Sequence, residues 1–535
     1  MPMLRAVPRE LKDGENNPVL FDVAYRVSGH GLADTVARIY GRHGPDTCLL
    51  PMSATSAGGG VFQQTPSHGE PVVGILVEPA PNPKIRKEAV SSLDSVSLDE
   101  IVIDQETMQV CAGGAITIDQ LNRSLAETVS PAFRVPGSDL TSYAYAQVGS
   151  TFMTGGMGPQ RRYFSDSVIE IALHSGRILE SIGQDRLSGY AGTYGWTGLV
   201  GAVRCRYVRL PQQEIAFAVP VRNDPSEIAA LLEHLSGYCF FEFEQETAVN
   251  LNGGPDVVTG LEHITVESMG PLIPHAPPAV NAPRAGALAG MARAAGADGV
   301  MFVSGCISRP ADEFLEMIVD NVRSDSFAIA GISLDSAEVF RTADEMRELR
   351  EAIPFAARVR EPEGEFRYKN HTDANVRLNP GNIAGSATAL WERNQRYVEG
   401  VESLIRGTGG LRGDILVYGH MNPYGVDPHN RLTLSADTQE VMQEAVESAT
   451  ALRAEFYRQL GEMCETTGSR MIGGEKGADS EHAILRAFGN PALAPRELSD
   501  KFRRQSETVT ASMRNFNWRA FELYRDPPDP NPSGP

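Results

Sequence analysis

The sequence lacks the features that mark a membrane-spanning, secreted or zinc-ribbon protein. No stretch approaches the roughly 18 consecutive apolar residues of a membrane-spanning helix. Residues 1–22 contain no apolar segment of the kind that a secretory signal needs. The six cysteines in 535 residues are widely spaced, and no pair has the CxxC spacing of a zinc ribbon or a dithiol redox motif. A cytoplasmic protein without a membrane span is therefore expected.

Basic residues are also few. The chain has 48 lysines and arginines against 68 aspartates and glutamates, which gives a net charge of −20. Nucleic-acid backbones and anionic membranes are bound by basic surfaces, so neither is an expected partner. With 41% apolar and 22% charged residues, the composition is that of an ordinary globular protein. The length predicts two or three domains.

The pattern of apolar residues changes near Pro211. Before it, β-branched runs such as Val72–Val77 and Val168–Ser175 alternate with glycine-rich turns, and Ile118–Thr128 has helical spacing. After it, strand–helix–strand units are typical of an antiparallel sheet covered by helices on one face. The sequence therefore predicts an α+β fold with a domain boundary close to Pro211.

A long helix is predicted from Thr438 to about Thr467, with Asp437 as its N-cap and Gly468 at its C-terminus. The tail 525–535 contains five prolines and is expected to be disordered or to lie on the surface.

Three segments have too little side-chain volume to pack a normal core: Leu50–Gly60, Gln147–Gly158 and Gly192–Gly198. Glycine lets the backbone approach a ligand closely and direct several N–H groups at an anion. A bound cofactor would supply the missing volume. A flexible surface loop has the same composition, so the first segment alone does not distinguish the two readings.

In their order along the chain, these segments resemble the flavin domain of the vanillyl-alcohol oxidase / p-cresol methylhydroxylase superfamily. The matching stretches are Pro51–Gly60, Val110–Gly113, Pro136 with Val148–Gly156, and Gly192–Gly201. The resemblance implies an FAD-dependent oxidoreductase that acts on a CH–OH group. It also implies a two-lobed FAD-binding domain of the p-cresol methylhydroxylase type and an antiparallel-sheet cap domain covered by helices. A Rossmann domain is not expected, because no G-x-G-x-x-G follows a first strand and opens a helix.

The resemblance divides the chain into an FAD-binding domain over 1–211 and a substrate or cap domain over 212–437. A C-terminal helical segment over 438–524 is expected to return to the flavin domain before the tail 525–535. FAD is expected to be non-covalent, because no histidine or cysteine lies in the first glycine-rich loop. The residues implied to contact it are Pro51, Ser53, Ala54, Thr55, Ser56, Ala57, Gly58, Gly59, Pro136, Gln147, Val148, Gly149, Ser150, Thr151, Thr154, Gly155, Gly198, Leu199 and Val200.

The second half is similar to the FAD-linked oxidase C-terminal domain of D-lactate dehydrogenases, glycolate oxidase subunits and D-2-hydroxyglutarate dehydrogenases. By this similarity His420, His429 and Glu475 would bind zinc or manganese with an open position for a substrate oxygen. The alternative is two unrelated loop histidines and a surface glutamate, because the histidine spacing exceeds that of the family and Pro423 and Pro428 restrict the loop between them.

The catalytic base has three candidates. Lys476 stands where the family has a histidine, and a lysine acts as a base only if its pKa is lowered. His371 is the second candidate, and a metal-bound water is the third. Arg367, with Lys369 and Arg377, offers a cationic patch for an acidic substrate, although a solvated strand edge has the same composition.

Three functions follow, in order of preference. The first is oxidation of an alcohol, above all a 2-hydroxy acid, by hydride transfer to flavin N5. The second is metal-free oxidation of para-substituted phenols or aromatic alcohols. The third is a non-catalytic flavin-binding subunit. The electron acceptor would be a quinone, an electron-transfer protein or oxygen. The sequence does not decide the oligomeric state, and a homo-oligomer is one alternative.

Overall fold

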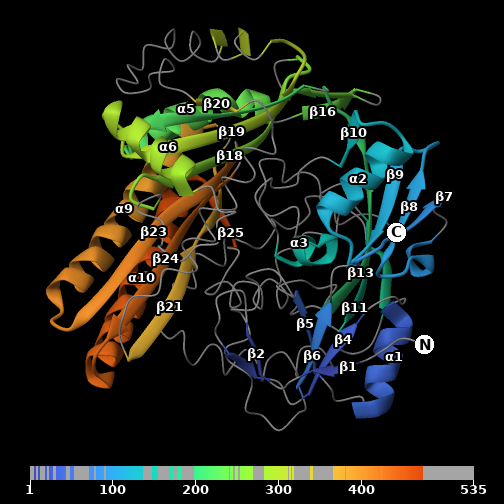
Figure 1. Ribbon diagram of the computed structural model, residues 1–535, viewed down its shortest axis with the longest axis horizontal. Helices are drawn as coiled ribbons and strands as arrows, with labels where there is room; N and C mark the ends of the chain where they lie inside the picture. Colours follow the sequence, from blue (N-terminus) through green and yellow to red (C-terminus); the bar gives the residue numbers. More distant parts are fainter. Residues whose placement is uncertain are drawn as a thin grey trace.

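Figure 1 shows the computed structural model of the chain. The structure describes residues 5–7, 10–12, 18–20, 23–27, 32–43, 48–53, 72–77, 80–89, 92–135, 147–154, 168–173, 178–182, 198–211, 213–239, 241–244, 247–250, 253–268, 282–310, 313–314, 316–317, 338–340, 365–379, 381–422 and 425–473.

The N-terminal half begins with a mainly parallel sheet of order β1-β4-β6-β5. Its strands are β1 (Arg5–Val7), β4 (Val23–Val27), β5 (Cys48–Ser53) and β6 (Val72–Val77). The amphipathic helix α1 (Leu32–His43) connects β4 to β5 and buries Val36 and Ile39. The short strands β2 (Glu10–Lys12) and β3 (Pro18–Leu20) pair with each other. Because β5 and β6 are parallel, both end at the same edge of the sheet, where Ser53 lies opposite Val77.

A second sheet follows, with the order β12-β11-β13-β9-β8-β7. Its strands are β7 (Lys84–Lys87), β8 (Glu100–Asp104), β9 (Gln109–Gly113), β11 (Val168–Leu173), β12 (Ile178–Ile182) and β13 (Gly198–Arg206). The one-turn 3-10 helix Leu93–Ser95 precedes β8. Helix α2 (Ile118–Thr128) has the predicted bounds and begins at a capping box, in which Thr117 Oγ1 accepts from the Gln120 backbone N–H and the Gln120 side chain accepts from the Thr117 N–H.

A small sheet joins the two halves of the molecule. It consists of β10 (Phe133–Arg134), β14 (Val208–Arg209), β17 (Thr247–Asn250) and β16 (Phe241–Glu244), in that order. Beside it, Val208 and Leu210 pack on Val257 and Cys306 of the C-terminal sheet. Apolar contact therefore links the halves at this point.

The C-terminal half is built on a large antiparallel sheet of order β20-β15-β19-β18-β23-β24-β22-β25, with β21 also beside β24. Its strands are β15 (Gln213–Val221), β18 (Val257–Thr265), β19 (Gly299–Ile307), β20 (Glu338–Phe340), β21 (Phe366–Asp373), β22 (Asn375–Arg377), β23 (Leu411–Asn422), β24 (Gly425–Ala436) and β25 (Arg470–Gly473). We call this sheet the cap sheet.

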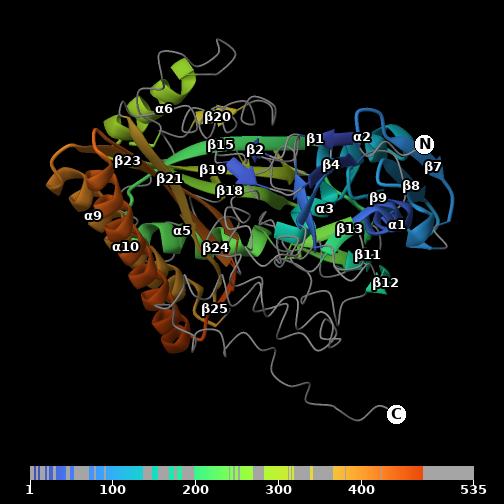
Figure 2. The same cartoon turned by 90° about the horizontal axis from the view of Figure 1, so that it is seen from below.

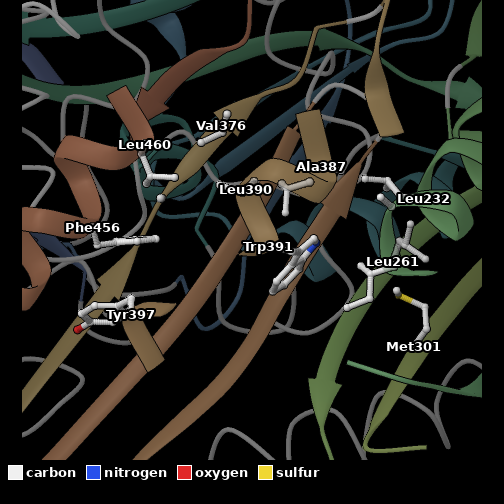
Figure 3. Packing of buried hydrophobic residues seen from close by; sticks show 14 of the residues in the cluster. Leu232, Leu261, Met301, Val376, Ala387, Leu390, Trp391, Tyr397, Phe456 and Leu460 are labelled. Carbon is white, nitrogen blue, oxygen red and sulfur yellow. The ribbon is translucent and has the colours of Figure 1, made fainter. Parts of the chain in front are cut away.

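Three helices cover one face of the cap sheet: α5 (Pro225–Cys239), α9 (Ile383–Gly407) and α10 (Gln439–Thr467). Figure 3 shows Trp391 and Leu390 of α9 packed between Leu261 and Met301 of the sheet and Leu460 of α10. This is the helix-covered face. On the opposite face, α6 (Ala282–Ala294) covers one end, where Leu288 packs among residues of β18 and β19, and Figure 2 shows α5 and α6 on opposite sides of the strands. The predicted α+β fold is confirmed.

Helix α10 begins one residue later than predicted. Thr438 is its N-cap and accepts a hydrogen bond from the Val441 N–H, whereas Asp437 forms an ion pair with Arg412 (2.7 Å). The prediction of Asp437 as N-cap was therefore wrong. Aspartate and threonine both cap helices, and here the aspartate side chain pairs with Arg412 while the threonine caps the helix. Gly468 ends the helix with a φ of 70°, as predicted.

The segment after residue 437 stays with the cap sheet as far as the structure describes it. Helix α10 packs on the helix-covered face and β25 pairs with β22. The predicted return to the flavin domain covered 438–524; residues 438–473 pack with the cap sheet, and residues 474–524, with the tail 525–535, lie outside the described residues. None of the described helices has the length and apolar character needed to cross a membrane.

His263 of β18 lies on the helix-covered face and has no access to solvent. Its ring meets Trp391 edge-on at 5.4 Å between centroids, and neither ring nitrogen has a hydrogen-bond partner within the described residues. A Cβ at position 299 would lie 2.6 Å from His263 Nε2, so Gly299 leaves room for the ring. Burial lowers the pKa of His263 from its usual 6.5 to about 4.

The His263 environment predicts a pH-dependent stability. The unfolded chain takes up a proton near pH 6.5 and the folded chain only near pH 4, so protonation favours unfolding as the pH falls between these values. The loss of unfolding free energy due to His263 is absent above about pH 6.5 and should reach roughly 3 kcal/mol near pH 4. Denaturant unfolding of His263→Phe should show a shallower loss of stability than the wild type from pH 6.5 to 4. Parallel curves for the two proteins would contradict the assignment.

Candidate functional site

The end of β6 is tied to helix α3 (Val148–Thr154) by a buried glutamine. The side chain of Gln147 is 1% exposed, and its Nε2 donates to the carbonyl of Val77 at 3.0 Å. Ser53 is opposite Val77 in the parallel register of β5 and β6. Strand β5 therefore ends, at Ser53, beside the strand end that Gln147 ties to the start of α3.

A glycine junction connects α3 to the second sheet, and we define it by Gly113, Gly114 and Gly149. The Gly114 N–H donates to the Gly201 carbonyl (2.7 Å), and the Gly149 N–H donates to the Gly114 carbonyl (3.2 Å). A Cβ on Gly114 would lie 2.4 Å from the carbonyl oxygen of Val200. The backbones of α3, β9 and β13 meet here with no side chain between them.

The second set of residues comes from the cap sheet. Tyr418 on β23 lies opposite His429 on β24, and their rings stack at 4.9 Å with an angle of 10°. Tyr418 packs on the cluster of Ile264 and Phe302 under α6, so Tyr418 and His429 lie on the face opposite α9 and α10. We call this the inner face. Strand alternation puts Asp427 and Arg431 on the same face as His429.

Four ionisable side chains are buried on the inner face. Glu262 of β18 is 1% exposed, Asp427 and His429 are 0% exposed, and Arg431 is 2% exposed. The carboxylate of Asp427 lies 3.5 Å from His429 Nε2. We call Glu262, Asp427, His429 and Arg431 the charged row. Burial of charged groups is costly unless they are paired, and such groups gather at functional sites more often than in structural cores.

The inner face is turned toward the N-terminal half. In Figures 1 and 2, α9 and α10 lie on the outer side of β21, β23 and β24, and the half that carries α3 and β5 lies on the other side of these strands. The charged row and the glycine junction therefore belong to facing parts of the molecule.

Solved structures with a similar fold are known. The chain matches p-cresol methylhydroxylase with substrate bound, at 12% identity over 94% of this chain and 89% of that one, with a TM-score of 0.54. It matches 4-ethylphenol oxidase from Gulosibacter chungangensis in an isoeugenol complex, at 12% identity over 91% and 88%, with a TM-score of 0.50. This chain has the p-cresol methylhydroxylase fold.

At this level of identity the likeness concerns the fold, and it confirms the fold that the sequence motifs predicted. A further match, to alkyldihydroxyacetonephosphate synthase, has 13% identity over 84% of this chain and 73% of that one, with a TM-score of 0.48, which is too low to carry an argument. No protein-family model matches the sequence, and no curated protein matches it significantly.

The p-cresol methylhydroxylase fold brings together three of the segments that the sequence assigns to FAD. The described residues are Pro51 and Ser53 on β5, Gln147 with Val148, Gly149, Ser150, Thr151 and Thr154 at α3, and Gly198, Leu199 and Val200 on β13. The others lie outside the described residues: Ala54, Thr55, Ser56, Ala57, Gly58, Gly59, Pro136 and Gly155.

The predicted metal and catalytic residues are only partly described. His420 lies on β23, opposite Asp427 and Glu262, and is thus in a strand rather than at the start of a loop. His371 pairs with Arg431 along β21, and Arg367 is exposed opposite Ser435. Glu475 and Lys476 lie outside the described residues, as does the side chain of His420. Among the described residues no group of three or more potential ligands could hold a metal ion.

Sequence reasoning missed Glu262, Tyr418, Asp427 and Arg431. The stretch 427–435 contains a signal, because Asp427, His429, Arg431, Thr433 and Ser435 alternate with mainly apolar neighbours. Such alternation is typical of a strand with one polar face. The prolines at 423 and 428 led to the interpretation of a loop, although Pro428 lies within β24.

The glycine junction predicts opposite effects for two matched substitutions. Gly114→Ala places a methyl group against the Val200 carbonyl and should lower the free energy of unfolding by about 2 kcal/mol. Gly41→Ala in α1 meets no atom within 4 Å and should be neutral or stabilising by about 0.5–1 kcal/mol. Urea denaturation of the purified variants measures both; equal effects would show that the junction is looser than described.

Proposed function

We propose that this chain is an FAD-dependent oxidoreductase that oxidises a small molecule bound through an acidic oxygen, either a carboxylate or a phenolate. The observation that carries the proposal is the charged row, buried on the face of the cap sheet that is turned toward the glycine junction. An oxidation of this kind needs a cofactor site and a substrate site facing each other.

The N-terminal residues fit FAD. The carboxyl ends of β5 and β6, the start of α3 and the first residues of β13 converge, and the junction between them contains glycine instead of side chains. Backbone that is free of side chains can approach a pyrophosphate and a planar ring system closely. When bound, FAD would supply the acceptor for the hydride that leaves the substrate carbon.

The charged row supplies the remaining roles. Arg431 would hold the anionic oxygen of the substrate by charge-assisted hydrogen bonds. His429 would accept the hydroxyl proton, and Asp427 beside Nε2 would stabilise the imidazolium that results. Tyr418, stacked on the imidazole, would fix the plane of the His429 ring. The earlier predictions remain: His371 or Lys476 as an alternative base, and Arg367 as part of a cationic patch for the substrate.

Two substrate classes share this chemistry. A 2-hydroxy acid would place its carboxylate at Arg431 and its hydroxyl at His429. A para-substituted phenol would place its phenolate at Arg431 and Tyr418, and one solved structure with a similar fold is a 4-ethylphenol oxidase. A quinone, an electron-transfer protein or oxygen would take the electrons afterwards.

Anaerobic bleaching of the flavin absorbance separates these classes. The purified protein would be mixed with lactate, glycolate and 2-hydroxyglutarate in one series and with p-cresol and 4-ethylphenol in another, and bleaching is expected in one of them. Arg431→Met should keep its flavin and be reduced about 10–100-fold more slowly, the effect of losing a hydrogen bond to a charged group. Arg412→Met, which removes an exposed ion pair on the neighbouring strand, should reduce at the wild-type rate.

The outcomes against the proposal are distinct. A yellow protein that no compound bleaches is a non-catalytic flavin-binding subunit. A protein that neither contains FAD nor gains thermal stability from it has no flavin function. Equal rates of flavin reduction in Arg431→Met and the wild type would show that the charged row does not bind the substrate.

Chelation tests the zinc or manganese site proposed for His420, His429 and Glu475. Because His429 Nε2 is directed at Asp427, we expect flavin reduction to continue after treatment with EDTA. A loss of reduction that zinc or manganese restores would establish the metal site instead, and a glycolate control without enzyme excludes effects of the metal alone.

A further inference from the structure

One polar side chain interrupts the apolar row that β24 presents to the helices. Val426, Leu432, Leu434 and Ala436 belong to the core beneath α9 and α10. Asn430 occupies a position in the same alternating row and is 0% exposed. A buried amide in an apolar core costs free energy unless its groups are hydrogen-bonded.

Asn430 is bonded to α9 and to β21. Its Nδ2 donates to Asn394 Oδ1 at 2.6 Å and to the carbonyl of Thr372 at 3.3 Å. Asn394 is itself 1% exposed. Asn430 Oδ1 has no hydrogen-bond partner within the described part of the chain. The amide therefore satisfies only part of its bonding capacity, so leucines in place of both Asn430 and Asn394 would suit the stability of this core better.

A second contact of the same kind lies beside it. The hydroxyls of Thr372 on β21 and Tyr397 on α9 are 2.9 Å apart, and both side chains are buried. Asn394 and Tyr397 are three residues apart on α9 and so lie on one face of that helix. Helix α9 is thereby tied to both β24 and β21 at adjacent points.

The tied residues lie between the functional ones. Asn430 stands between His429 and Arg431, and Thr372, opposite Asn430, stands between His371 and Asp373. Side chains alternate along a strand, so His429 and Arg431 point to the face opposite Asn430. The hydrogen bonds of Asn430 on the helix-covered face therefore hold in place the segment of β24 that carries His429 and Arg431. A shift of one residue would exchange the two faces.

We propose that Asn430 and Asn394 are positioning residues: their hydrogen bond holds β24 against α9 so that His429 and Arg431 keep the geometry needed for substrate oxidation. The inference rests on the proposed function. It explains why a pair of buried amides stands where two apolar side chains would stabilise the fold more.

A double-mutant cycle on the flavin-loaded protein tests the inference. Asn430→Leu, Asn394→Leu and the double variant should keep the wild-type flavin content. Each single variant leaves the other buried amide without its partner and should unfold at a lower urea concentration than the wild type, whereas the double variant should unfold at the same or a higher urea concentration. Each should lower the limiting rate of anaerobic flavin reduction about 10–100-fold, the effect of a small misplacement of reacting groups, with a smaller change in KM. The double variant should be no slower than the slower single variant, because both remove one interaction.

The matched control is Asn250→Leu. Asn250 is also buried, and its Nδ2 donates to the Asp256 carbonyl at 2.7 Å, but it lies in β17 of the small joining sheet. This variant should lose stability and reduce its flavin at the wild-type rate. Wild-type reduction rates in Asn430→Leu, or additive losses in the double variant, would overturn the inference. A wild type that no substrate reduces would overturn the proposed function itself, and the two failures are distinguished by whether the wild type is active.

Discussion

The alternation of side chains along β24 is the constraint on which the rest of the site depends. One set of positions packs Val426, Leu432 and Leu434 beneath α9 and α10, and the other set presents the ionisable side chains of Asp427, His429 and Arg431. The apolar set holds the strand in register, and the register decides where the charges lie. The packed core and the charged row thus occupy opposite sides of one strand.

Charges on a sheet face can stay buried only if other groups stabilise them. The carboxylate of Asp427 lies beside His429, and the imidazole of His429 stacks on Tyr418. His263 shows the contrast on the helix-covered face. It has no such partners among the described residues, and burial therefore lowers its pKa to about 4 and keeps it neutral at neutral pH.

The N-terminal half could be predicted well because its signals are local. The bounds of β6 and α2 follow from β-branched and helical spacing, and the glycine-rich segments follow from composition. The backbone contacts of Gly114 with Val200 and Gly201 could not be predicted, because these residues lie far apart in the sequence and local patterns carry no information about such contacts.

The cap could be predicted less completely for a physical reason. Pro428 argues against a strand interior, yet β24 contains it, because tertiary packing overrode the local preference. Asp427 and Arg431 were missed together with that strand. His420 and His429 were predicted to bind one metal ion; cross-strand pairing puts them on the adjacent strands β23 and β24, opposite Asp427 and Tyr418. The partners of a β-strand are set by the whole sheet and not by nearby sequence.

The charged row of the cap sheet is expected to face bound FAD, and benzoate, an unreactive carboxylate, tests this arrangement most directly. Titration of the FAD-loaded wild type with benzoate should give a saturable change in the visible absorption spectrum of the flavin. Arg431→Met with the same flavin content should bind benzoate at least about tenfold more weakly, since a charge-assisted bond is lost. Equal benzoate affinity in the two proteins, or no spectral change in the wild type, would contradict the account.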